Sequence, residues 1–324
     1  MTQLEAAATA IATGELALPV RRMLGVSDLA VFPLALGANV FGWTADDAEA
    51  HRVLDVFRAA GGNLVDTADS YAGGRSETMI GNWMRSRRAR NEMVVATKVG
   101  KGADHPGLTP RAIESAVNDS LRRLDVGTID LLFLHIDDAE VPFEETLLAV
   151  DSLIRAGKVR WFGGADHTGN RLIEARVACG QLGVAPMVAL QQHYNLVHRT
   201  EYEGPLARIA AAQSLAVLPR FALAGGFLSG KYRTRADLAA HRRAGEASRH
   251  PGRKGLRVLG VLDRIAEETA TSPASVAIAW LLSRQGVAAP VVSATSAEQV
   301  PELMAGVHLR LTRHQLSELD RVSG

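Results

Sequence analysis

The stretch MVVATKVGKGADHPGLTPRAIESAVNDSLRRLDVGTIDLLFLH (93–135) contains two short apolar runs separated by an amphipathic segment. The runs, 93–97 and 129–134, are rich in β-branched residues and leucine, which is typical of strands in a parallel sheet. Between them, Thr109 stands before Pro110, a helix cap followed by a first-turn proline, so we expect a helix over residues 110–124. The stretch therefore predicts one strand–helix–strand unit.

The same alternation extends to both ends of the chain. From residue 32 onward, strand-like runs occur at 32–36, 63–65, 93–97, 129–134, 159–162, 187–190, 215–218 and 290–292. Helical patterns fill the gaps at 46–60, 77–88, 110–124, 143–156, 170–179, 205–212, 255–270 with 273–283, and 297–305. Eight successive strand–helix pairs predict a (β/α)8 TIM barrel, a single domain over residues 21–324. A doubly wound open sheet is the alternative, but no GxGxxG follows the first run.

Three segments lie outside the eight pairs. A hairpin is expected over 23–31, turning near Ser27 and Asp28, and a last amphipathic helix over 313–322 is expected to pack across the outside. Residues 1–20 form an N-terminal extension without a cationic start, which predicts an extra helix or an arm and not a signal peptide.

Composition excludes several classes of function. The chain of 324 residues has 36 Lys and Arg against 35 Asp and Glu, a balance that argues against a nucleic-acid partner. No run approaches eighteen apolar residues, so no membrane span is predicted. The single cysteine, Cys179, cannot form an internal disulfide, which fits a reducing compartment. We therefore expect a cytoplasmic protein, with no prediction of its oligomeric state.

A basic stretch follows the seventh strand-like run. Residues 231–257 carry nine Lys and Arg residues against Asp237 and Glu246: Lys231, Arg233, Arg235, Arg242, Arg243, Arg249, Arg253, Lys254 and Arg257. The stretch is either a solvated loop or a lid over an anionic ligand, because barrels often bind phosphate beside the loops after strands seven and eight.

Three consecutive strand-like runs are each followed by an ionisable residue, Asp66, Lys98 and His135, and Tyr71 lies shortly after the first. Singly, such residues are more often turn formers, packing residues or solvated groups. In a barrel they would share one mouth, where Lys98 would lower the pKa of Tyr71 towards neutrality and Asp66 would hold Lys98 charged. His135 would donate a hydrogen bond to a developing oxyanion. Such a site has no nucleophile, so the missing reactant is a cofactor hydride.

The run VDTADSYAGGRSETMIG (65–81) resembles the DTA-x-x-Y-x-x-G-x-S-E signature of the aldo-keto reductases. ATKVG, LLFLH, GKVRWFGG, ALAGGFLSGKY and SATSAEQVPEL follow in the family's order, so the resemblance covers the chain from about Arg21. It implies a barrel that binds an extended nicotinamide cofactor without a Rossmann fold. It also implies the catalytic tetrad Asp66, Tyr71, Lys98 and His135, with Tyr71 protonating a carbonyl oxygen as NAD(P)H delivers hydride to the carbon.

The resemblance also implies cofactor contacts. Gln191 would contact the nicotinamide carboxamide, and the segment 220–225 would follow the ring and pyrophosphate. The residues on the adenosine side would be Lys231, Thr295, Gln299 and Glu302. The residues concerned are Asp166, Gln191, Arg220, Phe221, Leu223, Gly225, Lys231, Thr295, Gln299 and Glu302. Phe41 and Trp43 follow the first strand and either line the substrate pocket or pack in the core.

This chain departs from the family pattern at two positions. Ala165-Asp166 replaces the Ser-Asn of many members, and Asp166 can accept from the carboxamide NH2 but cannot donate to its carbonyl. Arg220 replaces the usual ring-stacking aromatic and would repel an oxidised, cationic nicotinamide. The two changes predict that the reduced cofactor is held better than the oxidised one.

We expect NADPH as the cofactor, with NADH as the alternative. Many relatives grip the 2′-phosphate with a basic residue in the closing motif, which here reads Ser293-Ala294-Thr295-Ser296. Potassium-channel β subunits, which share the fold, have a similarly uncharged stretch and use basic residues of the preceding loop. The basic stretch 231–257 would serve the same purpose.

Two other functions remain open. Lys98 at a strand end is where a Schiff-base lyase would place its lysine, although Asp66 would keep it protonated. A nucleotide-sensing regulatory subunit is the second, but the channel β subunits carry Asn at the position of His135. No metal is expected, because His193, His198, His241 and His250 follow no metal-ligand spacing. The substrate is expected to be a small carbonyl compound or a sugar-like molecule.

Overall fold

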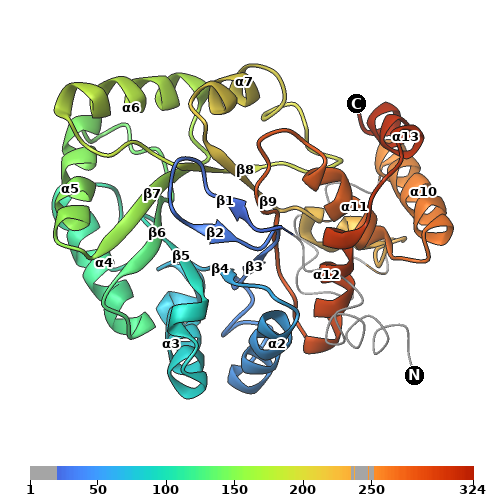
Figure 1. The fold of residues 1–324 in the computed structure, drawn as a ribbon, viewed down its shortest axis with the longest axis horizontal. Helices are drawn as coiled ribbons and strands as arrows, with labels where there is room; N and C mark the ends of the chain where they lie inside the picture. Colours follow the sequence, from blue (N-terminus) through green and yellow to red (C-terminus); the bar gives the residue numbers. More distant parts are fainter. Residues whose placement is uncertain (1–19, 235–236, 238–246, 248–251) are drawn as a thin grey trace.

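The computed structural model describes residues 20–234, 237, 247 and 252–324. Its main sheet consists of the parallel strands β3 (Ala35–Gly37), β4 (Leu64–Asp66), β5 (Val94–Val99), β6 (Ile129–Leu134), β7 (Val159–Ala165), β8 (Ala189–His193), β9 (Ala216–Arg220) and β10 (Val291–Val292). They are ordered β10-β3-β4-β5-β6-β7-β8-β9, and a parallel bridge from Val217 to Val287 brings β9 next to the segment before β10 (Figure 1). The (β/α)8 TIM barrel is confirmed. The doubly wound alternative is wrong, because the strand order follows the chain with no switch point.

Helices surround the strands on the outside (Figure 1). They are α2 (Asp47–Ala59), α3 (Arg75–Arg87), α4 (Pro110–Leu124), α5 (Phe143–Arg155), α6 (Gly169–Leu182), α7 (Pro205–Ala212), α11 (Pro273–Leu282) and α12 (Val300–His308). The caps predicted at Thr109 and Ser272 are present, since their side chains accept from the backbone N–H groups of Ala112 and Ser275. The starts of α4 and α11 are therefore encoded locally.

The predicted hairpin closes the amino-terminal end of the barrel. Strands β1 (Arg22–Met23) and β2 (Ala30–Val31) are antiparallel, and buried Leu24 and Leu29 pack against the barrel interior. Gly25 turns the chain at a φ of +59°, and a Cβ there would lie 2.3 Å from the Val188 carbonyl oxygen, so only glycine fits. The plugged end leaves the carboxyl-terminal end of the strands for a functional site.

The first barrel strand differs from the prediction. It spans Ala35–Gly37, whereas the pattern predicted 32–36. The backbone N–H of Phe32 donates to the Asn63 side chain at 2.7 Å, and Pro33 has no N–H to donate to a neighbouring strand. Apolar residues before the strand therefore belong to the link from the hairpin, which sequence periodicity does not distinguish from a strand.

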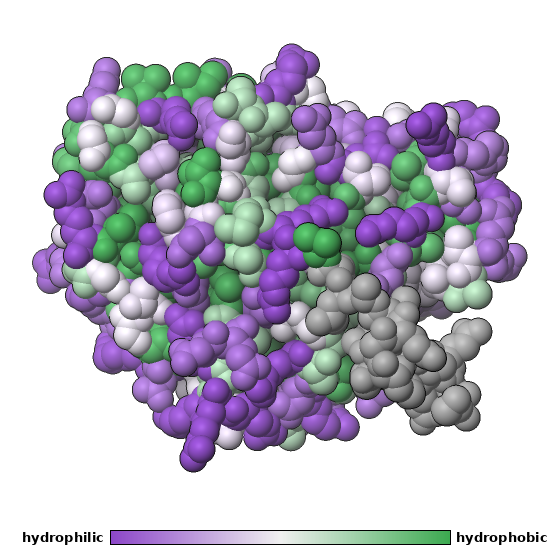
Figure 2. Space-filling model, in the orientation of Figure 1, coloured by the Kyte–Doolittle hydropathy of each residue, from purple (hydrophilic) through white to green (hydrophobic). Residues whose placement is uncertain are grey.

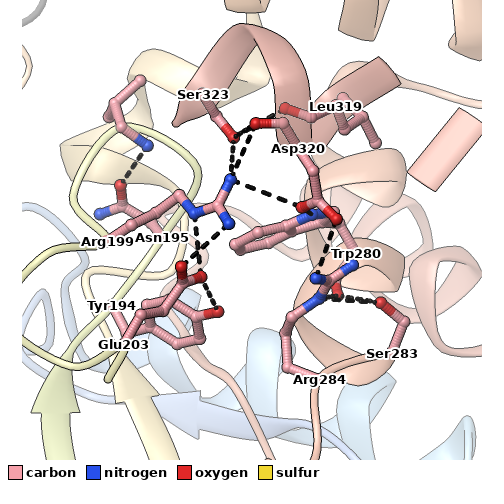
Figure 3. Close-up of polar contacts among 11 residues, drawn as sticks. Tyr194, Asn195, Arg199, Glu203, Trp280, Ser283, Arg284, Leu319, Asp320 and Ser323 are labelled. Carbon is pink, nitrogen blue, oxygen red and sulfur yellow. Dashed lines mark hydrogen bonds and ion pairs between the residues drawn. The ribbon is translucent and has the colours of Figure 1, made fainter. Parts of the chain in front are cut away.

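The C-terminal helix packs outside the ring, as predicted. Helix α13 (Arg313–Ser323) lies beside α10 (Arg253–Glu268) (Figure 1). Asp320 accepts from the Trp280 indole at 2.9 Å and from Arg284 at 3.1 Å, and Arg199 donates to Ser323 at 2.6 Å (Figure 3). The Arg199 guanidinium also lies 5.3 Å from the Trp280 ring centroid. Two arginines and an indole thus tie the helix to α11 and to the loop after β8.

Hydrophobic side chains on the face shown in Figure 2 are interspersed with hydrophilic ones, and several gather at the upper left over α6. Ile173 and Val177 of this helix are 46% and 53% exposed. In the segments that the structure describes, no helix is long and apolar enough to cross a membrane. The predicted N-terminal extension, apart from Val20, and most of the basic stretch 231–257 lie outside the described residues.

Candidate active site

Asp66 and Lys98 meet at the carboxyl ends of β4 and β5. The Lys98 Nζ atom donates to Asp66 Oδ2 at 2.6 Å and to the Thr67 carbonyl at 2.9 Å. The other oxygen of Asp66 accepts from Gln191 Nε2 at 2.8 Å. The side chains of Lys98 and Asp66 are only 1% and 3% exposed, so their ion pair is shielded from water.

Lys98 is held in its charged form. Burial lowers the pKa of this ammonium. The charge of Asp66 and the contact with Tyr71 raise it by more, so the net pKa lies above its usual value. Lys98 is thus a fixed positive charge beneath the phenol.

Tyr71 begins a short 3-10 turn, η1 (Tyr71–Gly74), in the loop after β4. Its hydroxyl lies 3.4 Å from Lys98 Nζ, and its ring meets the His135 ring edge-on, with centroids 6.1 Å apart. Burial raises the pKa of Tyr71, the Lys98 charge opposes this, and the net pKa is above 10.0. The expected decrease towards neutrality is therefore wrong, because burial outweighs the Lys98 charge. At neutral pH Tyr71 keeps its proton.

His135 follows β6, and its backbone N–H donates to the Val99 carbonyl at 2.9 Å. Burial, followed by the charges of Lys98, Lys101 and Arg220, lowers the pKa of the imidazole to about 2. The ring is therefore neutral. Its Nδ1 atom is buried with no hydrogen-bond partner in the described part of the chain, which leaves Nε2 as the ring nitrogen that can reach a ligand.

The second half of the 65–81 signature anchors the loop that carries Tyr71. Ser76 donates to the Ala38 carbonyl at 2.9 Å. Glu77 is fully buried and accepts from Thr97 at 2.6 Å and from Arg123 at 2.7 Å. No separate role for Glu77 follows from the sequence. An acidic residue in the first turn of a helix is common, so the local sequence does not signal this buried pair. A fully buried glutamate is rarely found without a partner.

A cleft of about 580 Å³ opens at the carboxyl end of the barrel. Asp66, Tyr71 and His135 line one end of it, while Lys98 lies behind them. All ten residues expected to contact a cofactor line the same cleft: Asp166, Gln191, Arg220, Phe221, Leu223, Gly225, Lys231, Thr295, Gln299 and Glu302. Asn39, Ser70 and Lys101 also line it, and the sequence predicted no role for them. Residues from distant parts of the chain thus meet in one place, and their roles stay predictions.

Asp166 and Arg220 are paired with each other. Arg220 Nε donates to Asp166 Oδ1 at 2.9 Å, and the second nitrogen lies 2.8 Å from Oδ2. The sequence predicted independent contacts, one to a carboxamide and one to a nicotinamide ring. In the structure both carboxylate oxygens contact Arg220 and the arginine charge is compensated, while the contacts of the two residues with a cofactor stay predictions.

The cleft has features that suit a dinucleotide. Its volume lies within the range of ligand pockets, roughly 300–1,000 Å³. One wall is the turn η3 (Ala224–Ser229), where Gly225 and Gly226 have φ values of +66° and +95°. A Cβ at residue 226 would lie 2.7 Å from the Lys231 side chain. At the far end, Gln299 accepts from the Thr295 backbone at 2.9 Å just before α12. Amide, backbone and ammonium donors therefore line the cleft, and these residues fit a dinucleotide cofactor.

Other expected residues lie elsewhere. Phe41 is fully buried in the core and Trp43 is 48% exposed, and neither lines the cleft, so their place in a substrate pocket stays a prediction. Within the described residues, no group of three or more His, Cys, Asp or Glu side chains is arranged to hold a metal. His193 and His198 stack with ring centroids 3.7 Å apart. His241 and His250 lie outside the described residues.

Comparison with known proteins identifies the family. The sequence model of the aldo/keto reductase family matches residues 33–323. A "Probable voltage-gated potassium channel subunit beta" of Oryza sativa subsp. japonica is 33% identical over 87% of this chain and 89% of its own length. A protein of the same name from Arabidopsis thaliana is 31% identical over 92% and 95%. A "Putative aryl-alcohol dehydrogenase" of Saccharomyces cerevisiae is 29% identical over 90% and 83%. The chain therefore belongs to the aldo/keto reductase family, whose members use NAD(P)H to act on small carbonyl compounds.

Proposed function

We propose that this protein reduces an aldehyde or ketone to the alcohol, with NADPH as the hydride donor and Tyr71 as the general acid. The observation that carries the proposal is the setting of Tyr71. Its hydroxyl lies 3.4 Å from the charged Lys98 and its ring faces His135 at the end of the cleft. At neutral pH the phenol carries the proton that the carbonyl oxygen needs.

When bound, reduced nicotinamide supplies the hydride to the carbonyl carbon. Tyr71 donates its hydroxyl proton to the carbonyl oxygen and becomes a phenolate. Lys98 stabilises that phenolate by its charge, and Asp66 keeps Lys98 protonated and in place. The neutral His135 orients the carbonyl oxygen by a hydrogen bond from Nε2, which strengthens as negative charge develops.

The chain's own residues would hold the cofactor along the cleft. The Gln191 amide suits the carboxamide, the backbone of η3 suits the pyrophosphate, and Thr295 and Gln299 suit the adenosine end. Of the described cations in the basic stretch, Lys231 lines the cleft. This ammonium supports NADPH, whose 2′-phosphate is the charge that NADH lacks.

The test is cofactor oxidation with NADPH and NADH against a panel of aldehydes, aldoses and diketones, with Tyr71→Phe as the matched variant. The loss of one hydroxyl is expected to lower kcat by about 10²–10⁴-fold. The Kd of NADPH, measured by calorimetry, is expected to stay within about twofold, because the proposed contacts to the cofactor lie elsewhere. A Tyr71→Phe variant that turns over as fast as the unmodified protein would overturn the proposal.

A nucleotide-sensing regulatory subunit is the second candidate, favoured by the names of the Oryza and Arabidopsis relatives. Tight NADPH binding without turnover of any carbonyl in the panel would support it. A Schiff-base lyase is disfavoured by the contacts of Lys98, which is buried and paired with Asp66 at 2.6 Å. Borohydride is expected to trap no substrate on this lysine.

A further inference from the structure

Lys101 stands at the catalytic end of the cleft, on the loop between β5 and α4. It follows Lys98 by three residues and lines the cleft together with Tyr71 and His135. Its loop is tightly seated at Gly102, where a Cβ would lie 2.7 Å from the Asp69 carboxylate. The backbone contact holds the base of Lys101 in place, and the residue as a whole is exposed.

Among the described residues, the two other cations whose charges act on His135 are already paired. Lys98 is engaged by Asp66, and the Arg220 fork is occupied by Asp166. Lys101 differs from them. Within residues 20–234 and 252–324, it forms no ion pair and no hydrogen bond.

Lys101 also lies close enough to Asp166, Arg220 and Lys98 for their charges to change its pKa. Partial burial lowers the pKa of its ammonium, the charge of Asp166 raises it, and the charges of Arg220 and Lys98 lower it. Its own charge in turn lowers the pKa of His135. The two ion pairs cancel in formal charge, so among the described residues Lys101 brings an uncompensated positive charge to the cleft that Tyr71 and His135 also line.

We propose that the carbonyl substrate of this protein carries a carboxylate, and that Lys101 binds it and determines this specificity. The inference rests on the function proposed above. Asp166 occupies the Nε edge of Arg220 and compensates its charge, so the uncompensated ammonium of Lys101 is the stronger attraction for a carboxylate. Such a point charge favours substrates that carry a negative charge and tolerates varied shapes in the rest of the substrate.

A pair of aldehydes that differ in charge tests this: 4-carboxybenzaldehyde and its methyl ester, each reduced with NADPH. The unmodified protein is expected to use the acid with a kcat/KM about tenfold above that of the ester, and most of the difference is expected in KM. Lys101→Met is expected to lose this preference while its kcat/KM for the ester stays within about twofold. Lys101→Arg is expected to retain most of it, and added salt to weaken it.

Binding supplies a readout independent of turnover. Calorimetry would compare the Kd values of 4-(hydroxymethyl)benzoate and its methyl ester for the protein saturated with NADP+. The acid is expected to bind about tenfold more tightly, and Lys101→Met is expected to lose this preference. Lys158→Met is the control, because it removes an equal charge just before β7, at the amino-terminal end of the barrel. This control is expected to keep the preference.

Equal use of acid and ester by the unmodified protein would overturn the inference, as would a Lys101→Met variant that loses both activities alike. A charge preference seen for glyceraldehyde 3-phosphate over glyceraldehyde, but absent for the carboxylate pair, would overturn the choice of carboxylate. If NADPH neither binds nor is oxidised with any aldehyde, the proposed function itself fails, and this inference fails with it.

Discussion

Arg220 and Asp166 form a bidentate ion pair across the mouth of the cleft, with N···O distances of 2.9 and 2.8 Å. Arg220 ends β9 and Asp166 follows β7, so the pair joins two separate strands of the barrel. Both residues depart from the pattern that the family resemblance implies. Each departure compensates the other, since the carboxylate neutralises the guanidinium that replaces an aromatic ring.

The pair predicts how the protein discriminates between cofactor redox states. In Asp166→Asn, Arg220 regains an uncompensated charge beside the proposed nicotinamide site, and an oxidised ring carries a positive charge. The ratio of Kd for NADP+ to Kd for NADPH is expected to rise by about three- to tenfold over that of the unmodified protein. Calorimetric titration with each nucleotide measures it.

The double variant Asp166→Asn with Arg220→Gln removes both charges and serves as the control. Its ratio is expected to return to near that of the unmodified protein. An unchanged ratio in Asp166→Asn would show that the Arg220 charge does not reach the nicotinamide.

Glu77 is expected to be essential for stability. In Glu77→Gln the Arg123 guanidinium loses its partner beside a fully buried position, and the free energy of unfolding is expected to fall by about 3 kcal/mol. Urea denaturation followed by circular dichroism measures this. Glu92→Gln, which breaks an exposed pair with Arg58, is the matched control and is expected to cost less than about 1 kcal/mol. Equal losses in the two variants would contradict the assignment.

His135 is expected to stay neutral throughout the usual assay range. Its folded pKa of about 2 lies below the usual 6.5, so only the unfolded chain takes up this proton between those values. The contribution to stability is thus complete above pH 6.5 and is lost on acidification, by up to about 1.4 kcal/mol per pH unit. His135→Gln is expected to flatten this dependence in melting curves between pH 7 and pH 5. A histidine NMR signal, assigned by its absence in His135→Gln, that titrated near pH 6.5 would refute the prediction.

Asp69 is expected to change stability with pH in the opposite direction to His135. Burial, and then the charge of Glu77, raise its pKa to about 6, so between about pH 4 and pH 6 the folded protein holds a proton that the unfolded chain has lost. Stability is therefore expected to fall as pH rises through this window. Asp69→Asn is expected to raise Tm above pH 6 by about 1–3 °C and to leave it unchanged below pH 4. Asp104→Asn, on the exposed part of the adjacent loop, is expected to show no such pH-dependent gain.

Local chemistry was enough to predict most of the barrel. Helix α4 has the bounds that the Thr109 cap and Pro110 indicated, and α7 likewise spans the predicted Pro205–Ala212. The first strand was misplaced because apolar residues in a link and in a strand have the same pattern, and only the contact from Phe32 to Asn63 separates them.

By itself, the sequence determined the alternation of strands and helices, and with it the shared mouth onto which Asp66, Tyr71 and His135 open, because successive parallel strands of a barrel end on one face. Only the tertiary structure decided which charges are paired there. Asp166 and Arg220 are 54 residues apart in the chain, and no local pattern shows that they meet or that Lys101 is left without a partner among the described residues. The same holds for the raised pKa of Tyr71, since burial depends on every segment that packs around the ring, and a spacing of residues contains no measure of it.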